Sequence, residues 1–287
     1  MHKPKYRLHI NLKQPLRQSL PGDWTGGARG KGYEFWQLKE YQKGDDVSLI
    51  DWKARARSRK LHVREFLRET FYNLMIFCDI SSSMFFGKKL ELMQDIGTSL
   101  AYAALKDNNS CGLVLFANNI VKYLPPNAKH NQYARITNEM HKASEAKKGK
   151  TSLQAAFKHL NTIVPGSFAI FLSDFIIDPR ESKLLSRSMQ GSGRSGHEIA
   201  CIHILEDVEY NFPRDLDTII SVRDNESGKN MDLDPAKARD GALHARYEDS
   251  KRQLAKLGMD SVLIRTSDHN VEQSINSFLS KRSQVAR

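Results

Sequence analysis

Short apolar runs alternate with amphipathic stretches from residue 73 onward, and this alternation predicts a sheet covered by helices. The strand candidates are 73–78, 111–117, 168–173, 198–205 and 261–265. The helix candidates are 88–106, 130–142, 152–163, 179–189, 235–257 and 270–282. Strands that are apolar along their whole length are expected where crossover helices bury both faces of a sheet. The pattern therefore predicts an α/β fold with a doubly wound, mostly parallel sheet.

Two segments break this rhythm and predict antiparallel additions. In residues 116–123 an Asn-Asn pair separates two short β-prone runs, which favours a hairpin. Residues 219–222 are also expected to pair with residues 231–233, across a polar loop that contains Gly228.

Residues 1–70 have a different texture, with glycine clusters, many charges and short aromatic or β-branched segments. They predict a small β-rich subdomain ahead of the α/β domain, which is expected to occupy residues 71–287. The whole chain carries a formal net charge of +11, and residues 1–70 contribute +8 of it. The basic balance of the protein therefore belongs to the predicted subdomain.

A basic block of this kind can bind nucleic acid, an anionic membrane surface or an acidic protein. No RRM, zinc-finger or helix-turn-helix signature is present, which disfavours a nucleic-acid partner. The block is equally consistent with a structural network of ion pairs, because the Gly44-Asp45-Asp46 turn and a half-buried Trp52 are ordinary determinants of a fold.

The composition also limits the class of protein. The longest uncharged apolar runs, such as 74–78 and 168–172, are far shorter than the roughly 18 residues that a membrane-spanning helix needs. The basic N-terminus is not followed by an apolar secretory signal. The three cysteines, Cys78, Cys111 and Cys201, lie in apolar runs without metal-binding spacing. We therefore expect a cytoplasmic protein with buried, reduced thiols.

Carboxylate and hydroxyl side chains stand at three turns that the predicted topology brings to one edge of the sheet. They are Asp79, Ser81 and Ser83 in the first turn, Thr151 in the second and Asp174 in the third. Ligands of open α/β sheets bind at the carboxyl ends of the strands, where these turns lie. Each residue alone is an ordinary turn or helix-capping residue. Their joint occurrence in this order favours a common site.

The chemistry of the five side chains suits a small, hard cation such as Mg²⁺ or Mn²⁺. Such ions prefer oxygen ligands in octahedral geometry and do not require thiolate or imidazole. Because three of the five ligands are neutral hydroxyls, one coordination position can stay open for an Asp or Glu of a partner protein.

These five positions match, in order, those of a metal-ion-dependent adhesion site, and residues 72–222 resemble a von Willebrand factor A domain. A second resemblance covers the N-terminal block. The residues concerned are Tyr33-Glu-Phe35, Glu40-Tyr-Gln-Lys-Gly44-Asp45-Asp46, Ile50-Asp51-Trp52 and Leu61-His-Val-Arg-Glu-Phe66. They are similar to the conserved block of the family known as domain of unknown function 58, a relative of von Willebrand factor A domains. The chain departs from that family at Lys39, where arginine is common, and in lacking N-terminal membrane helices.

The resemblance implies a function in protein assembly. Members of that family are typically encoded near MoxR-type AAA+ ATPases, and such pairs are thought to remodel, activate or load metal into client proteins. The resemblance therefore implies a chaperone-like adaptor, whose metal site binds a carboxylate of the ATPase or of its client.

Enzymatic alternatives receive less support from the residues. A haloacid-dehalogenase-type phosphotransferase expects Asp where Ser81 stands, and the phosphate-loop spacing around Gly30 is incomplete. The glycine pattern of 191–196 precedes a strand instead of opening a helix. Metal-assisted hydrolysis at Asp79 and Asp174 stays an open alternative, because an open coordination position can also bind water. We expect a binding protein and not an enzyme.

Overall fold

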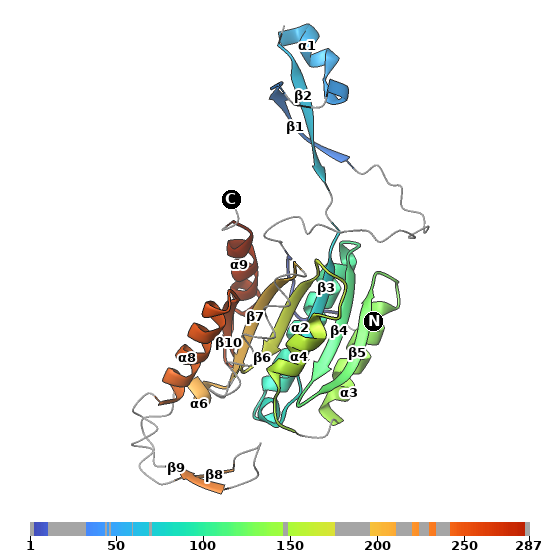
Figure 1. Cartoon of the computed structure of the whole chain (residues 1–287). Coiled ribbons are helices and arrows are strands. Elements are labelled where there is room, and N and C mark those ends of the chain that lie inside the picture. The colour runs from blue at the N-terminus through green and yellow to red at the C-terminus, as the bar shows by residue number, and fades with distance from the viewer. Residues whose placement is uncertain are drawn as a thin grey trace. The chain divides into compact units, whose positions relative to one another are not determined.

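A computed structural model of the chain describes residues 3–10, 33–43, 45, 47–58, 60–68, 71–145, 149–175, 196–210, 220–223, 230–233 and 242–284. Within these residues there are two compact units (Figure 1). The smaller unit is formed by 33–71, and the larger by 3–10 together with 72–284. The helix predicted at 179–189 lies outside the described residues.

The smaller unit is built on an antiparallel pair, β1 (Tyr33–Glu40) with β2 (His62–Arg68). A 3₁₀ turn, η1 (Val47–Leu49), and a helix, α1 (Trp52–Ser58), lie between the two strands in the chain. The two strands agree with the β-rich character that the sequence predicts. The helix was not predicted, because its seven residues carry alternating cations without an apolar face.

Asp51 explains why α1 begins where it does. Its Oδ1 accepts the N–H groups of Lys53 and Ala54, both at 2.9 Å, which caps the helix. Its Oδ2 pairs with Arg64 Nε of β2, also at 2.9 Å. Trp52, expected to be half-buried, is instead 58% exposed, with the Arg55 guanidinium 5.4 Å above its ring.

The larger unit contains, in its described part, a six-stranded sheet of order β10-β7-β6-β3-β4-β5 (Figure 1). Its strands are β3 (Asn73–Asp79), β4 (Ser110–Phe116), β5 (Ile120–Asn127), β6 (Phe168–Ser173), β7 (Glu198–Leu205) and β10 (Asp260–Arg265). Neighbouring strands are parallel except β5, which pairs antiparallel with β4 as the predicted hairpin. The predicted α/β fold with a mostly parallel sheet is confirmed.

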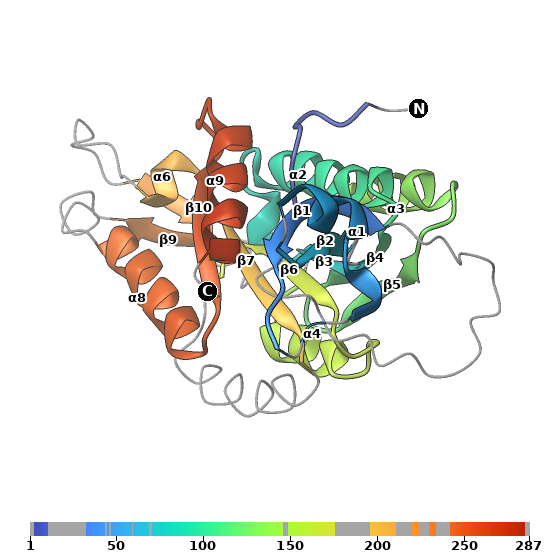
Figure 2. The same ribbon diagram turned by 90° about the horizontal axis from the view of Figure 1, so that it is seen from above.

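Helices cover both faces of this sheet (Figure 2). One face packs against α2 (Lys89–Lys106), α3 (Gln132–Lys142) and α9 (Val271–Gln284). The other packs against α4 (Leu153–Leu160) and α8 (Ala242–Lys256). In β3, Leu74 and Ile76 enter the first core, and Met75 and Phe77 enter the second. Burial on both faces is the reason this strand has no polar alternation.

Shorter elements connect these layers. They are η2 (Ser82–Phe85), η3 (Ala143–Glu145) and α6 (Asp207–Tyr210). A separate antiparallel pair, β8 (Ile220–Arg223) with β9 (Asn230–Leu233), confirms the second predicted pairing.

Residues 3–10 pack on the α/β unit, whereas the sequence placed them in the N-terminal subdomain. Leu8 is buried in the core shared by α2 and α9. The N–H of Tyr6 donates to Ser99 Oγ at 3.1 Å, and the N–H of His9 donates to Asn276 Oδ1 at 2.8 Å. Tyr6, Leu8 and Ile10 alternate with polar residues and all three pack on this core, but the alternation does not show which unit receives them.

The three cysteines are buried, as predicted. Burial raises the pKa of the Cys78, Cys111 and Cys201 thiols. Of the helices that the structure describes, none is both long and apolar enough to cross a bilayer.

Candidate metal centre

The site lies where three connected segments meet beyond the carboxyl ends of β3, β4 and β6. The N–H of Ser82, after β3, donates to the Gly149 carbonyl at 2.8 Å. The N–H of Ser152 donates to the Ala117 carbonyl, after β4, also at 2.8 Å. Ser152 then caps α4 by accepting the Ala155 N–H at 3.3 Å. These bonds fix the loop that carries Thr151 against the loop that carries Ser81 and Ser83.

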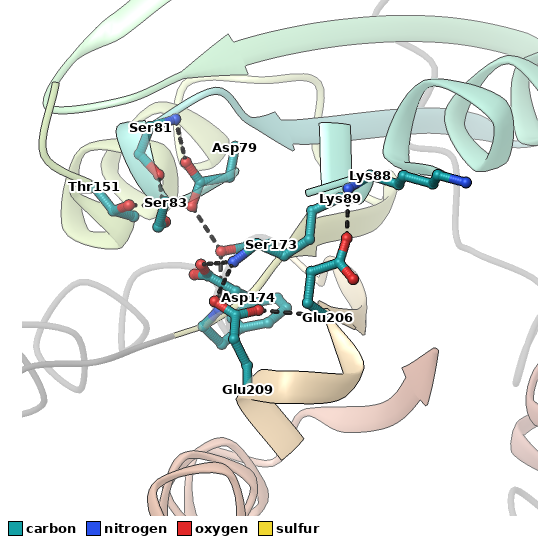
Figure 3. A network of polar contacts seen from close by, with 11 residues as sticks. Asp79, Ser81, Ser83, Lys88, Lys89, Thr151, Ser173, Asp174, Glu206 and Glu209 are labelled. Atoms are coloured by element: carbon teal, nitrogen blue, oxygen red, sulfur yellow. Dashed lines mark hydrogen bonds and ion pairs between the residues drawn. The ribbon is translucent and has the colours of Figure 1, made fainter. Parts of the chain in front are cut away.

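Asp79 is the centre of the cluster (Figure 3). Its Oδ1 accepts the Ser81 N–H at 2.9 Å. Its Oδ2 accepts two hydroxyls, Ser173 at 2.7 Å and Thr151 at 3.3 Å. The hydroxyl oxygens of Ser81 and Ser83 lie 3.1 Å apart. Four of the five predicted residues are therefore in one hydrogen-bonded cluster.

The charge of Asp79 is not balanced inside the described structure. Its side chain is fully buried, and among the described residues no cation pairs with it. Burial raises the pKa of Asp79, the negative charge of Asp174 raises it further, and hydrogen bonds from Ser173 and Ser81 oppose the rise. A raised pKa disfavours the charged form of Asp79, and a bound dication would favour it again by offsetting its charge.

Asp174, the fifth predicted residue, reaches the same edge but is already paired. Its side chain is almost completely buried, and its Oδ2 lies 3.1 Å from Lys89 Nζ. Lys89 is itself 0% exposed and also pairs with Glu209 Oε1, at 2.7 Å. Burial lowers the pKa of Lys89, but the two carboxylates outweigh it, so the net pKa is raised and the ammonium stays charged.

Sequence reasoning missed Ser173 and Lys89. Ser173 precedes Asp174 directly, so its place at the strand end was a usable signal. Lys89 is the first residue of α2, where the positive end of the helix dipole disfavours a cation. A lysine at that position was a hint that a carboxylate lay nearby.

A further network holds the turn before α2. Glu206 follows β7, and its carboxylate accepts the Lys88 N–H and the Thr266 hydroxyl, the latter at 2.6 Å. The Glu206 N–H donates to Glu209 at 2.9 Å. Gly87 has a positive φ of 57°, and a Cβ there would lie 2.0 Å from Glu206 Oε1. Glycine is therefore required for this contact.

These residues fit a hard dication. Asp79 and Ser81 form a buried floor, and Ser83 and Thr151 are partly exposed, so the cluster has an accessible side. All donors are oxygens, which matches Mg²⁺ or Mn²⁺. Within the described residues, no three His, Cys, Asp or Glu side chains gather as a metal-binding group. Metal binding here would therefore depend on the hydroxyls.

The sequence profile of the family described as "Protein of unknown function DUF58" matches residues 37–255. The chain belongs to this family. The match includes the second half of β1, the whole of β2 and the candidate site, so the family sequence spans parts of both compact units.

Two of the related sequences are uncharacterised mycobacterial proteins, Rv1480 of Mycobacterium tuberculosis and Mb1516 of Mycobacterium bovis. Each is 26% identical over 294 residues, covering 97% of this DUF58 chain and 89% of the relative. Among solved structures, BatB from Bacteroides thetaiotaomicron aligns with a TM-score of 0.50 and 15% identity, over 74% of this chain and 99% of BatB. The VWA domain of SpRpn10 aligns with a TM-score of 0.38 and 14% identity, over 74% and 95%. The BatB alignment supports the fold alone.

Proposed function

We propose that this DUF58 protein is a divalent-metal-dependent adaptor that binds other proteins. Asp79, Ser81, Ser83 and Thr151 would hold Mg²⁺ or Mn²⁺, and Asp174 would complete the set. The observation that carries the proposal is the buried Asp79 carboxylate, which has neutral oxygen donors around it and no partner cation among the described residues. When bound, the ion supplies a positive site for an Asp or Glu of the partner.

The surroundings of the cluster support an acidic partner. Lys88 and Lys150 flank the two site loops and are exposed, and no described carboxylate forms a salt bridge with either ammonium. Such a rim attracts negative charge before contact. Phe86, 40% exposed in the same turn, adds apolar surface that a protein partner can cover.

The resemblance described in the sequence analysis supports a proposal for the class of partner. We propose that the ligand carboxylate belongs to a MoxR-type AAA+ ATPase, to its client, or to both, and that the protein acts in the cytoplasm in chaperone-like activation or assembly. The role proposed is binding and not catalysis.

The test is a pull-down from native cell extract with wild type and Asp79→Ala, each with Mg²⁺ and with EDTA. The proposal expects an ATPase or client to be retained only by wild type with Mg²⁺. Circular dichroism verifies that the variant is folded. Retention of the same partners in all four samples would refute metal-dependent binding.

A second candidate function is binding of nucleic acid or another anionic surface through the smaller unit. It is favoured by α1, where Lys53, Arg55 and Arg57 are exposed beside the exposed Trp52. Aromatic and cationic side chains together bind phosphates and bases. This function predicts an affinity that falls steeply with salt and does not change with EDTA. Addition of EDTA therefore distinguishes it from the metal-dependent adaptor, whose binding EDTA should abolish.

A further inference from the structure

We propose that Lys89 is a resident cation that makes metal binding at this site conditional on an acidic ligand, so that ion and carboxylate bind as a pair. The inference rests on the proposed function and specifies how that site is regulated. The two buried aspartates of the cluster differ in their partners, because Lys89 binds Asp174 whereas no described cation binds Asp79.

The first step concerns Asp174. Its side chain is 2% exposed and that of Lys89 is 0% exposed, with 3.1 Å between Oδ2 and Nζ. A direct contact at this distance engages the Asp174 carboxylate, so an incoming dication would have to compete with Lys89 for it. Asp79 is then the buried carboxylate of the site that no described cation engages.

Further contacts hold the Lys89 ammonium in place. Glu209 Oε1 also binds it, at 2.7 Å (Figure 3). The Phe86 ring centroid lies 5.9 Å from the same nitrogen. The backbone is held as well, because Glu206 accepts the N–H of the preceding Lys88. Lys89 is therefore fixed at both ends.

The third step is electrostatic. Asp174 follows Ser173, whose hydroxyl donates to Asp79, and Lys89 binds Asp174. A dication beside Asp79 would therefore share this buried region with the ammonium, and repulsion there is screened far less than in water. With Asp174 engaged by Lys89, the ion alone has one available carboxylate and binds weakly. A carboxylate from a partner supplies the missing negative charge. By linkage, the acid strengthens metal binding by the same factor that the metal strengthens acid binding.

A purely structural role for Lys89 makes a different prediction. A buried ion pair adds little net stability compared with apolar residues in its place. Removing one partner, however, leaves the other charge buried and lowers the free energy of unfolding. If Lys89 is only structural, removing its charge changes stability and leaves metal affinity unchanged.

The experiment measures Mn²⁺ affinity of the full chain by isothermal titration calorimetry, in acetate and in chloride of equal ionic strength. Acetate is the probe for the partner carboxylate. For wild type we expect acetate to tighten Mn²⁺ binding on the order of tenfold. The variant Lys89→Gln with Glu209→Gln removes one charge of each sign and releases Asp174 from the Lys89 ammonium. It should bind Mn²⁺ about tenfold tighter than wild type in chloride, with little further gain from acetate.

Three further variants make the result decisive. Glu209→Gln alone leaves Lys89 to Asp174, so it should bind Mn²⁺ no more tightly than wild type. The matched control Lys122→Gln with Glu139→Gln removes a partly exposed pair, 3.6 Å apart, on β5 and α3, and should behave as wild type. Asp79→Ala should not bind Mn²⁺ in either salt. Melting curves in EDTA verify that each variant is folded.

The outcomes separate the two proposals. Equal Mn²⁺ affinity of wild type and the Lys89/Glu209 variant, with binding lost in Asp79→Ala, overturns the role of Lys89 and keeps the metal site. No Mn²⁺ binding by folded wild type, with or without acetate, overturns the metal site itself. If the double variant does not fold, tighter binding by Glu209→Gln alone still contradicts the inference.

Discussion

A buried cation lies between two carboxylates at each end of β7. One of these ion clusters is structural, and the other adjoins the candidate functional site. At the carboxyl end, Lys89 lies between Asp174 and Glu209. At the amino end, Arg282 of α9, 4% exposed, pairs with Asp260 at 2.8 Å and Glu198 at 3.2 Å. The two clusters have the same composition of charge.

Their surroundings differ. The Arg282 guanidinium donates to the Ile199 carbonyl at 2.8 Å and lies over the rings of Phe168 and Phe278, at 5.1 and 5.6 Å. It joins α9 to β7 and β10. The Lys89 cluster instead lies beside a hydroxyl cluster and the uncompensated Asp79. A buried cation between two carboxylates therefore holds elements of the fold together at the amino end of β7. At the carboxyl end the same arrangement lies beside the candidate metal site.

The largest effect is expected from breaking the amino-end cluster. Arg282→Met removes the buried cation that Glu198 and Asp260 share, and we expect the free energy of unfolding to fall by roughly 3–5 kcal/mol. Urea denaturation measures the loss. Lys122→Met removes a partly exposed pair and should change stability by less than about 1 kcal/mol.

Arg282→Met should leave the Mn²⁺ affinity of the folded protein as in wild type. A change in metal affinity would mean that the two ends of the sheet are coupled, and the contrast between them would fail.

The next prediction compares the two buried aspartates at the carboxyl end. Asp174→Asn leaves Lys89 with one carboxylate, and we expect a loss of about 2 kcal/mol in the free energy of unfolding, measured in EDTA. Asp79→Asn removes a buried charge that has no described counter-ion, so its stability in EDTA should equal or exceed that of wild type.

Addition of Mn²⁺ sharpens this comparison. Wild type should be stabilised by Mn²⁺ because the ion binds the folded state, and Asp79→Asn should show no such rise. Equal losses of stability for both aspartates in EDTA would contradict the assignment of different charge environments to them.

A loss of similar size is expected at Gly87. Gly87→Ala places Cβ against Glu206 and strains the backbone, so we expect a loss of about 2 kcal/mol and weaker Mn²⁺ binding. Gly258 is the matched control, because its φ is also positive, 74°, and no described atom lies within 4 Å of the place that a Cβ would take there. Gly258→Ala should lose only about 1 kcal/mol, through backbone strain. Equal losses would show that the Glu206 contact does not matter.

The sequence predicted those parts of the molecule that depend on local pattern. Apolar runs such as 74–78 identify strands, because burial on both faces removes polar alternation. The order of strand ends places Asp79 and Asp174 at one edge, since parallel strands bring their carboxyl ends together. The bound metal stays a prediction.

The parts that were missed depend on contacts between distant residues. Lys89 meets Asp174 and Glu209, 85 and 120 positions away. The lysine at the start of α2 hints at a nearby carboxylate, but nothing in the helix pattern shows which one it meets. Tyr6, Leu8 and Ile10 alternate with polar residues, which does not show that they dock on α2 and α9. Charge pairing across the fold is decided by tertiary packing, and a single sequence does not display it.

The smallest effect is expected at His203, which lies in β7 between the two charged ends. Its ring is fully buried against Phe175 and Tyr247, with centroids 4.7 and 5.2 Å away. Among the described residues neither ring nitrogen has a hydrogen-bond partner. We therefore expect His203→Phe to raise the free energy of unfolding by about 1 kcal/mol at pH 7.

The pH dependence of this gain follows from the pKa of His203. Burial lowers it to about 3, Asp174 opposes the shift and Lys251 adds to it. In the unfolded chain the pKa is about 6.5. Below pH 6.5 the unfolded state therefore binds a proton that the folded state does not, and wild type loses stability as pH falls. The advantage of His203→Phe should grow from pH 7 to pH 5 in urea denaturation. A difference in the free energy of unfolding that stays constant with pH would mean that the protonated imidazole has a partner in the folded protein. His203 would then not belong to an uncharged part of β7 between the two ion clusters.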